Sequence, residues 1–143
     1  YGLAGLRVGW GLFPPNIARD MRKVMNPNTI TQAGQAAAKA ALLDQDYMRE
    51  TCHETARLRD GLRQHLQQIG LNVPESFTNF ILIRMGSSEA AQRMDEVLRA
   101  KGVFLRPQGA VGLANCLRLP IGAAAQLDFA AQLLKPPINE DIS

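Results

Sequence analysis

The chain opens on Tyr1-Gly2-Leu3-Ala4-Gly5-Leu6-Arg7-Val8-Gly9-Trp10-Gly11, in which four glycines and one arginine interrupt an apolar run. Gly5 and Gly9 flank Arg7, so the backbone can approach a ligand closely or take a positive φ beside a fixed charge. Bulky residues then alternate with glycines, which predicts a strand with one bulky and one bare face, at Val8, Trp10 and Leu12. A guanidinium held between glycines suits a phosphate group. A surface arginine in a glycine-rich turn is the alternative.

The composition restricts the class of protein. The chain has 143 residues, of which 46% are hydrophobic and 20% charged, as in ordinary globular proteins. No apolar run approaches the ~18 residues that span a bilayer, which argues against a membrane protein. The net charge of +3 is dispersed, without a basic block, which argues against nucleic acid as a partner. Cys52 and Cys116 lie far apart, so neither a disulfide framework nor a zinc site is indicated, and a reducing cytoplasm fits.

The first half of the sequence predicts three helices. Pro15 can start a helix that ends before Asn26-Pro27. Thr29 or Thr31 can cap a second, alanine-rich helix over residues 32–43, which we expect to be buried. The longest periodic segment covers residues 47–69 and bridges two parts of the protein. Its apolar stripe consists of Met48, Cys52, Thr55, Leu58, Leu62, Leu66 and Ile69.

The second half alternates strand and helix signals. Strands are predicted at 71–73, 77–85, 103–106 and 116–121. In the second of these, Phe80, Leu82 and Arg84 share one face, and Asn79, Ile81 and Ile83 the other. One helix starts at Ser87 or Ser88 and closes at Gly102, with Ala91, Met94, Val97 and Leu98 inward, and another ends near Leu134. The order predicts an α+β unit with a mainly antiparallel sheet covered on one side.

No self-contained catalytic centre is evident, but arginines stand at strand–loop junctions. Arg106 ends the predicted strand before Pro107, and Arg118 lies inside an apolar strand, where a cation needs an anionic partner. An arginine fork suits bidentate capture of a carboxylate or phosphate. The alternatives are a strand-end side chain pointing to solvent for Arg106 and an edge-strand side chain extending outward for Arg118.

Four motifs, in this order, resemble one family. They are YGLAGLRVGW (1–10), TNFILIRM (78–85), GVFLRP (102–107) and CLRLPIG (116–122). Together they resemble the C-terminal part of the fold type I, pyridoxal-phosphate-dependent aminotransferases, and most of all the histidinol-phosphate group. The resemblance implies the end of the cofactor-binding large domain at 1–45, a small C-terminal domain at 46–135 and a tail at 136–143, which we expect to be disordered.

The resemblance also implies roles for the three arginines. Arg7 matches the residue that pairs with the phosphate of pyridoxal 5'-phosphate. Arg118 matches the one that binds the substrate α-carboxylate, and Arg106 resembles one that faces the distal phosphate of the substrate. The family's Schiff-base lysine falls two positions before Tyr1, so we expect this chain alone to be inactive. The segment 27–30, Pro-Asn-Thr-Ile, departs from the family's usual Pro-aromatic-Asn.

The resemblance implies an aminotransferase that exchanges an amino group between histidinol phosphate and 2-oxoglutarate in histidine biosynthesis. It implies a cytoplasmic homodimer whose partners are a small amino-acid phosphate and a 2-oxo acid, without nucleic acid or membrane. Other members of the superfamily stay open, namely an aspartate or aromatic aminotransferase or a threonine-phosphate decarboxylase. A non-catalytic basic binding module is the alternative from a different class.

Overall fold

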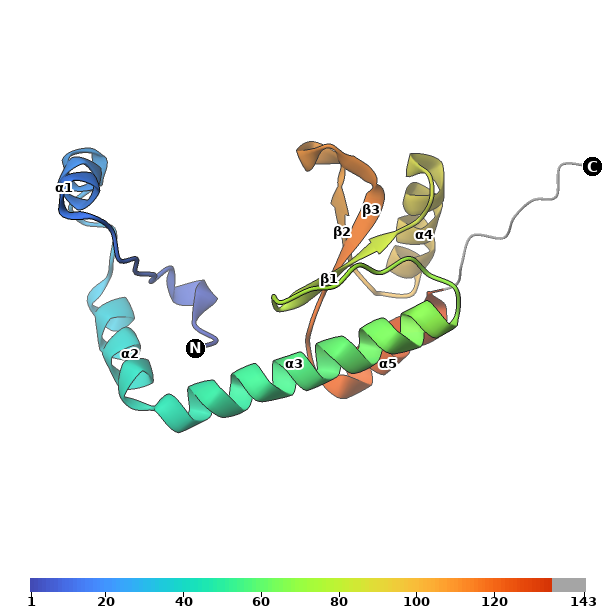
Figure 1. Ribbon diagram of the computed structural model, residues 1–143, viewed down its shortest axis with the longest axis horizontal. Helices are drawn as coiled ribbons and strands as arrows, with labels where there is room; N and C mark the ends of the chain where they lie inside the picture. The colour runs from blue at the N-terminus through green and yellow to red at the C-terminus, as the bar shows by residue number, and fades with distance from the viewer. Residues whose placement is uncertain (135–143) are drawn as a thin grey trace, which may run out of the picture. The chain divides into compact units, whose positions relative to one another are not determined.

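The structure is a computed structural model that describes residues 1–134; the tail predicted at 136–143 lies outside the described residues. The chain divides into two compact units, Tyr1–Cys52 and the part from His53 onward (Figure 1). The boundary predicted at residues 45 and 46 stays a prediction. Within the described residues, no helix has the length and apolar character needed to cross a membrane.

The first unit contains a short 3-10 helix, η1 (Ala4–Leu6), and two α-helices, α1 (Pro15–Val24) and α2 (Gln32–Leu43). Pro15 stands at the first turn of α1, where its missing N–H costs no hydrogen bond. The hydroxyl of Thr31 accepts a hydrogen bond from Gly34 N at 3.0 Å and caps α2. Both helices confirm the sequence prediction, including Thr31 as one of the two proposed caps.

Two expectations for this unit are wrong. Val8, Trp10 and Leu12 form no strand, because a strand needs a neighbouring strand to pair with and residues 1–52 contain none. Helix α2 is not buried either: Gly34 is its one buried residue, at the point where Val8 packs against it. A Cβ added at Gly34 would lie 2.9 Å from Val8 Cγ2, so a larger residue here would force the Val8 side chain or the helix to shift.

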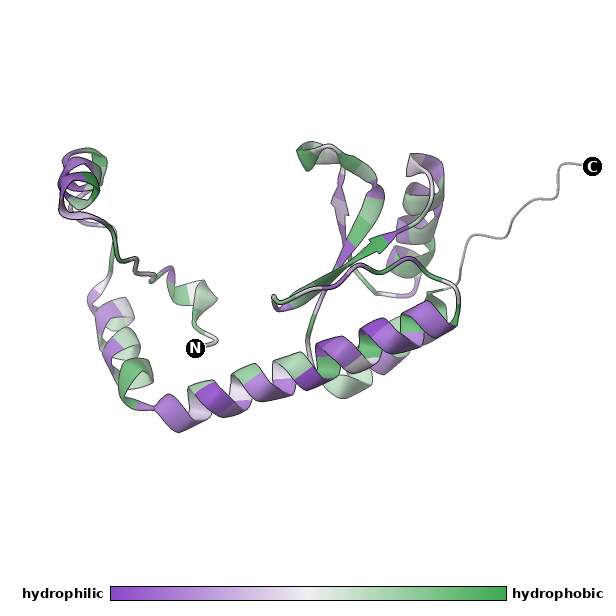
Figure 2. Ribbon diagram, viewed as in Figure 1, coloured by the Kyte–Doolittle hydropathy of each residue, from purple (hydrophilic) through white to green (hydrophobic). Residues whose placement is uncertain are grey.

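Helix α3 (Gln45–Gln68) is the long helix that the periodicity predicts. Gly70 stops the helix shortly after Gln68, because its φ of +91° lets Leu71 N donate to Leu66 O at 3.0 Å. Only the second half of its predicted stripe reaches the core: Leu62 and Leu66 are buried, whereas Cys52 is exposed. Figure 2 shows the mixed polar and apolar residues along α3.

The second unit is built on a three-stranded antiparallel sheet in the order β1-β3-β2 (Figure 1). Its strands are β1 (Phe80–Arg84), β2 (Arg106–Gln108) and β3 (Leu113–Pro120). The strand predicted at 71–73 is reduced to one bridge between Asn72 and Arg84. The strand predicted at 103–106 is misplaced, because β2 begins at Arg106 and continues through Pro107. An edge strand tolerates the missing N–H of proline.

The core lies on one face of this sheet. Ile81 and Ile83 of β1 and Leu117 and Leu119 of β3 are buried there, as the predicted alternation requires. Helices α4 (Ser88–Ala100) and α5 (Ala124–Leu133) contribute buried residues to the same cluster. Val97, predicted to point inward, is 52% exposed. It stands about 120° around the helix from Ala91, away from the face that Ala91 and Leu98 share.

The buried face of β3 gives a stability prediction. Leu117→Ala should lower the free energy of unfolding by about 2–5 kcal/mol, because it leaves a cavity among well-packed neighbours. Val97→Ala should change it by less than ~0.5 kcal/mol, as expected for an exposed helical position. Urea unfolding followed by circular dichroism measures both. Equal losses from the two variants would contradict the placement of the core.

Candidate functional site

Arg7 adopts a backbone conformation that non-glycine residues rarely take. Its φ of 56° and ψ of 34° lie in the left-handed region, where it closes η1 and donates its N–H to Ala4 O at 3.1 Å. Among residues 1–134 it is the one non-glycine residue with positive φ. The positive φ therefore falls on the arginine itself and not on Gly5 or Gly9. This conformation costs on the order of 1–2 kcal/mol for an L-residue, and such strain clusters at functional sites.

The Arg7 guanidinium has N–H donors without a hydrogen-bond partner among the described residues. Its Nη1 donates to Ala4 O at 3.1 Å, the side chain is exposed, and no carboxylate among the described residues pairs with it. Three helix arginines differ, since Arg49, Arg57 and Arg99 each meet a carboxylate at 2.7 Å. Arg7 is thus a fixed, unneutralised cation beside a tight turn, as an anion site requires.

Arg106 and Arg118 are brought together by the sheet. They are register partners on β2 and β3, directly opposite each other. Leu82 of β1 is the partner of Arg118 on its other side. Because β3 is the central strand, Arg118 is no edge-strand residue, and that alternative is excluded. The core face is formed by the neighbouring residues of β1 and β3, so Arg118 stands on the opposite face.

The surroundings of Arg118 suit an anionic ligand. Its Nε is buried and has no hydrogen-bond partner among the described residues, and no ion pair neutralises it there. A buried donor without a partner costs about 1–3 kcal/mol, more when it is charged. The Arg106 cation opposite adds repulsion. Anionic groups bound at the two arginines would satisfy their donors and offset the repulsion.

Sequence reasoning missed one participant in this arrangement, Phe80. The Arg118 Cζ atom lies 4.9 Å from the centre of its ring, within cation–π range. The sequence placed Phe80 on the strand face opposite to Ile81 and Ile83, but only the register with β3 shows that it neighbours Arg118. Arg7 belongs to the other unit, Tyr1–Cys52.

Within residues 1–134, no three His, Cys, Asp or Glu residues gather as ligands for a metal ion. The candidate residues are two arginines paired across a small antiparallel sheet in the second unit and, in the first unit, one arginine in a glycine-rich turn. Unpaired arginines of this kind are typical of sites that bind small anionic molecules.

Comparison with known proteins identifies the family of this chain. Residues 1–134 match the family model described as aminotransferase class I and II. The chain belongs to this family.

Similar curated proteins include histidinol-phosphate aminotransferases. One from Paracoccus denitrificans is 34% identical over 134 residues, which is 94% of this chain and 36% of that protein. Another, from Ralstonia nicotianae, is 37% identical over 123 residues, 85% of this chain and 33% of that protein. The chain thus spans about a third of the length of these relatives.

Solved structures agree with the fold. Histidinol-phosphate aminotransferase from Sinorhizobium meliloti, in complex with pyridoxal-5'-phosphate, superposes with a TM-score of 0.82 at 34% identity. The match covers 92% of this chain and 36% of that one. An aspartate aminotransferase from Thermotoga maritima matches with a TM-score of 0.64 at 22% identity, covering 82% and 32% of the two chains. The second unit is therefore the small α+β part of a fold type I aminotransferase, as the sequence predicted.

The arginine pair predicts a measurable repulsion. Arg106→Gln should raise the free energy of unfolding by about 0.2–1 kcal/mol at low salt, because it removes a like charge opposite Arg118. The gain should shrink in about 1 M NaCl, where the Debye length is about 3 Å. Arg22→Gln is the control, since Arg22 is exposed on α1 and lies outside the sheet. Equal gains from both variants in urea unfolding would contradict the pairing.

Proposed function

We propose that this chain is the C-terminal part of a pyridoxal-phosphate-dependent aminotransferase that exchanges an amino group between histidinol phosphate and 2-oxoglutarate, in histidine biosynthesis. The observation that carries the proposal is the Arg106–Arg118 register pair with its unpartnered buried Nε. The names of the similar curated proteins support the choice of substrate.

The residues present fit the cofactor. Arg7 offers an unneutralised guanidinium, held by a bond to Ala4 O and by a left-handed backbone, to which a dianionic phosphate can bind. When bound, pyridoxal phosphate supplies an electron-accepting ring for carbanion chemistry at the amino-acid α-carbon. Arg7 would hold the phosphate end and fix the position of the ring.

The two sheet arginines would bind the substrates. Arg118 would bind the α-carboxylate of the 2-oxo acid, and Arg106 would face the phosphate of histidinol phosphate. A planar fork on a strand gives each anionic group a defined direction, which orients the reacting carbon. The proposed role of both residues is binding and orientation, and neither moves a proton.

We also propose that the whole enzyme is a cytoplasmic homodimer. Large apolar side chains of the first unit are exposed in this chain, Trp10 at 79% and Leu12 at 92%. Apolar surface of this kind marks contacts with further protein.

The substrate assignment predicts a selective loss. In the full-length protein, Arg106→Ala should lower kcat/KM for histidinol phosphate about 10- to 100-fold, because a charge-assisted hydrogen bond contributes about 1.5–3 kcal/mol. Turnover of an unphosphorylated amino donor should change little. Steady-state kinetics on histidinol phosphate, aspartate and an aromatic amino acid measure this. Preference of the wild type for aspartate or an aromatic amino acid would overturn the substrate, and no transamination at all would overturn the function.

The cofactor assignment predicts a loss confined to the phosphate. Arg7→Ala in the full-length protein should weaken pyridoxal phosphate binding about 10- to 100-fold, for the same reason. Binding of pyridoxal, which lacks the phosphate, should be unchanged. Equilibrium titration of the apo-protein followed by absorbance measures both. Arg22→Ala on α1 is the control, and an equal loss for the two cofactor forms would refute the phosphate contact.

A further inference from the structure

We infer that Phe80 is a positioning residue for Arg118: its ring fixes the guanidinium in the orientation that receives the anionic group of the substrate. The inference deepens the proposed function and rests on it. Phe80 and Arg118 are diagonal neighbours on one face of the sheet, because Phe80 opposes Pro120 and Leu82 opposes Arg118. Side chains at diagonal positions are within reach when one is aromatic or long.

The ring replaces a partner that Arg118 lacks. No carboxylate pairs with Arg118 among the described residues, its Nε is buried without a hydrogen bond, and the ring centre lies 4.9 Å from Cζ. A carboxylate in this place would neutralise the cation and compete with the substrate. An aromatic face holds a guanidinium without using its N–H donors in the plane. The donors thus stay available to an anion.

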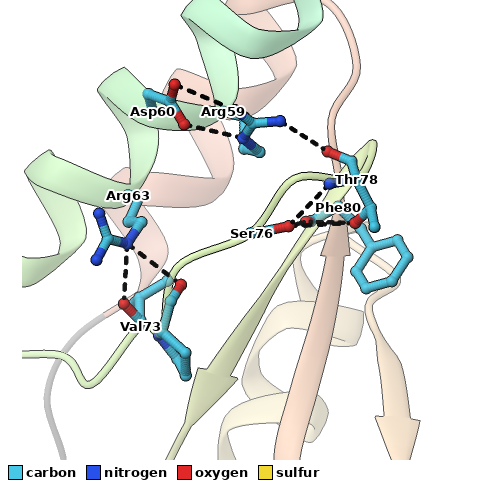
Figure 3. A network of polar contacts seen from close by, with 8 residues as sticks. Arg59, Asp60, Arg63, Val73, Ser76, Thr78 and Phe80 are labelled. Atoms are coloured by element: carbon cyan, nitrogen blue, oxygen red, sulfur yellow. Dashed lines mark hydrogen bonds and ion pairs between the residues drawn. The ribbon is translucent and has the colours of Figure 1, made fainter.

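The backbone of Phe80 is itself anchored. Ile121 N donates to Asn79 O at 2.8 Å, so Phe80 and Pro120 form a non-hydrogen-bonded pair and the Phe80 carbonyl points away from β3. Two hydroxyls from the preceding loop satisfy that carbonyl: Ser76 Oγ at 2.6 Å and Thr78 Oγ1 at 3.2 Å. Figure 3 shows both bonds converging on Phe80.

Helix α3 fixes the same loop. Arg59, with only 11% of its side chain exposed, donates Nη1 to Thr78 O at 3.3 Å and pairs with Asp60 at 2.8 Å (Figure 3). Hydrogen bonding to Arg59 lowers the pKa of the Asp60 carboxyl. Arg63 Nε donates to Val73 O and Pro74 O, both at 3.2 Å. The loop before β1 is thus fixed to the helix at both ends.

A purely structural role for Phe80 fits the structure less well. Its ring is half-buried and stands on the sheet face opposite to Ile81 and Ile83, which carry the core. The ring therefore contributes little to the main hydrophobic cluster. Its one recorded aromatic contact is with Arg118.

The test separates positioning from packing in the full-length enzyme with pyridoxal phosphate bound. Phe80→Leu should raise KM for 2-oxoglutarate, whose α-carboxylate Arg118 is proposed to bind, about 5- to 30-fold, the range that a half-buried cation–π contact supplies, while kcat and the KM for histidinol phosphate stay within about threefold. Phe80→Tyr, which keeps the π face, should restore KM. Phe104→Leu is the matched control, because Phe104 lies 5.6 Å from Arg99 on an exposed surface, and it should leave KM unchanged.

A second series does not depend on the leucine variant folding. Replacing Phe80 by mono-, di- and trifluorophenylalanine keeps the shape and progressively weakens the π face, so KM should rise stepwise while the melting temperature stays constant. Unchanged KM, or equal losses for the leucine and tyrosine variants, would overturn the inference.

Inorganic phosphate, titrated calorimetrically into the same cofactor-loaded proteins without turnover, gives a separate readout. Its Kd should rise about 5- to 30-fold in Phe80→Leu. A wild type that binds phosphate in this Phe80-dependent way but transaminates no donor would overturn the proposed function and leave the pairing standing. A wild type that transaminates, with phosphate affinity independent of Phe80, would overturn the pairing alone.

Discussion

The side chains of the central strand β3 alternate between the two faces of the sheet, and this alternation determines how the second unit is organised. Each step along the strand turns the side chain from one face to the other, so Leu117 and Leu119 enter the core while Arg118 between them cannot. A slip of one residue would expose the leucines and bury the guanidinium among Ile81, Ile83 and the helices. The hydrophobic core therefore fixes the register, and the register places Arg118 between Leu82 and Arg106.

Fixing the register in this way leaves a cation in an unfavourable place. Arg118 faces another arginine across the strand pair, and its buried Nε lacks a partner. Some helix arginines of this chain are instead neutralised by ion pairs along one helix face, as in Arg57–Glu54 and Arg99–Asp95. The sheet arginines gain no such compensation from the described residues. Folding stability does not select this arrangement, which suits binding of an anion.

Local patterns predicted most elements but not the partners that elements make. The helices from Pro15, Gln32 and Ser88 follow from caps, proline and periodicity, which are properties of neighbouring residues. The failures concern contacts between distant residues. A strand from Val8 needs a neighbour to pair with, and burial of α2 needs a surface to cover it. Pro107 can be part of β2 because β2 is an edge strand. The position of a strand within its sheet cannot be predicted from neighbouring residues.

The same limit applies to the candidate site. Arg106 and Arg118 could be selected as arginines beside strands, yet their opposition and the ring of Phe80 depend on the pairing of strands far apart in sequence. Arg7 differs, because its left-handed φ is a property of the local backbone. The sequence suggested a positive φ for the flanking glycines and not for Arg7 itself. Glycine at position 7 would adopt that conformation without strain, but it would carry no guanidinium. The positive φ of an arginine here is thus consistent with a role for its side chain and not with a need of the turn.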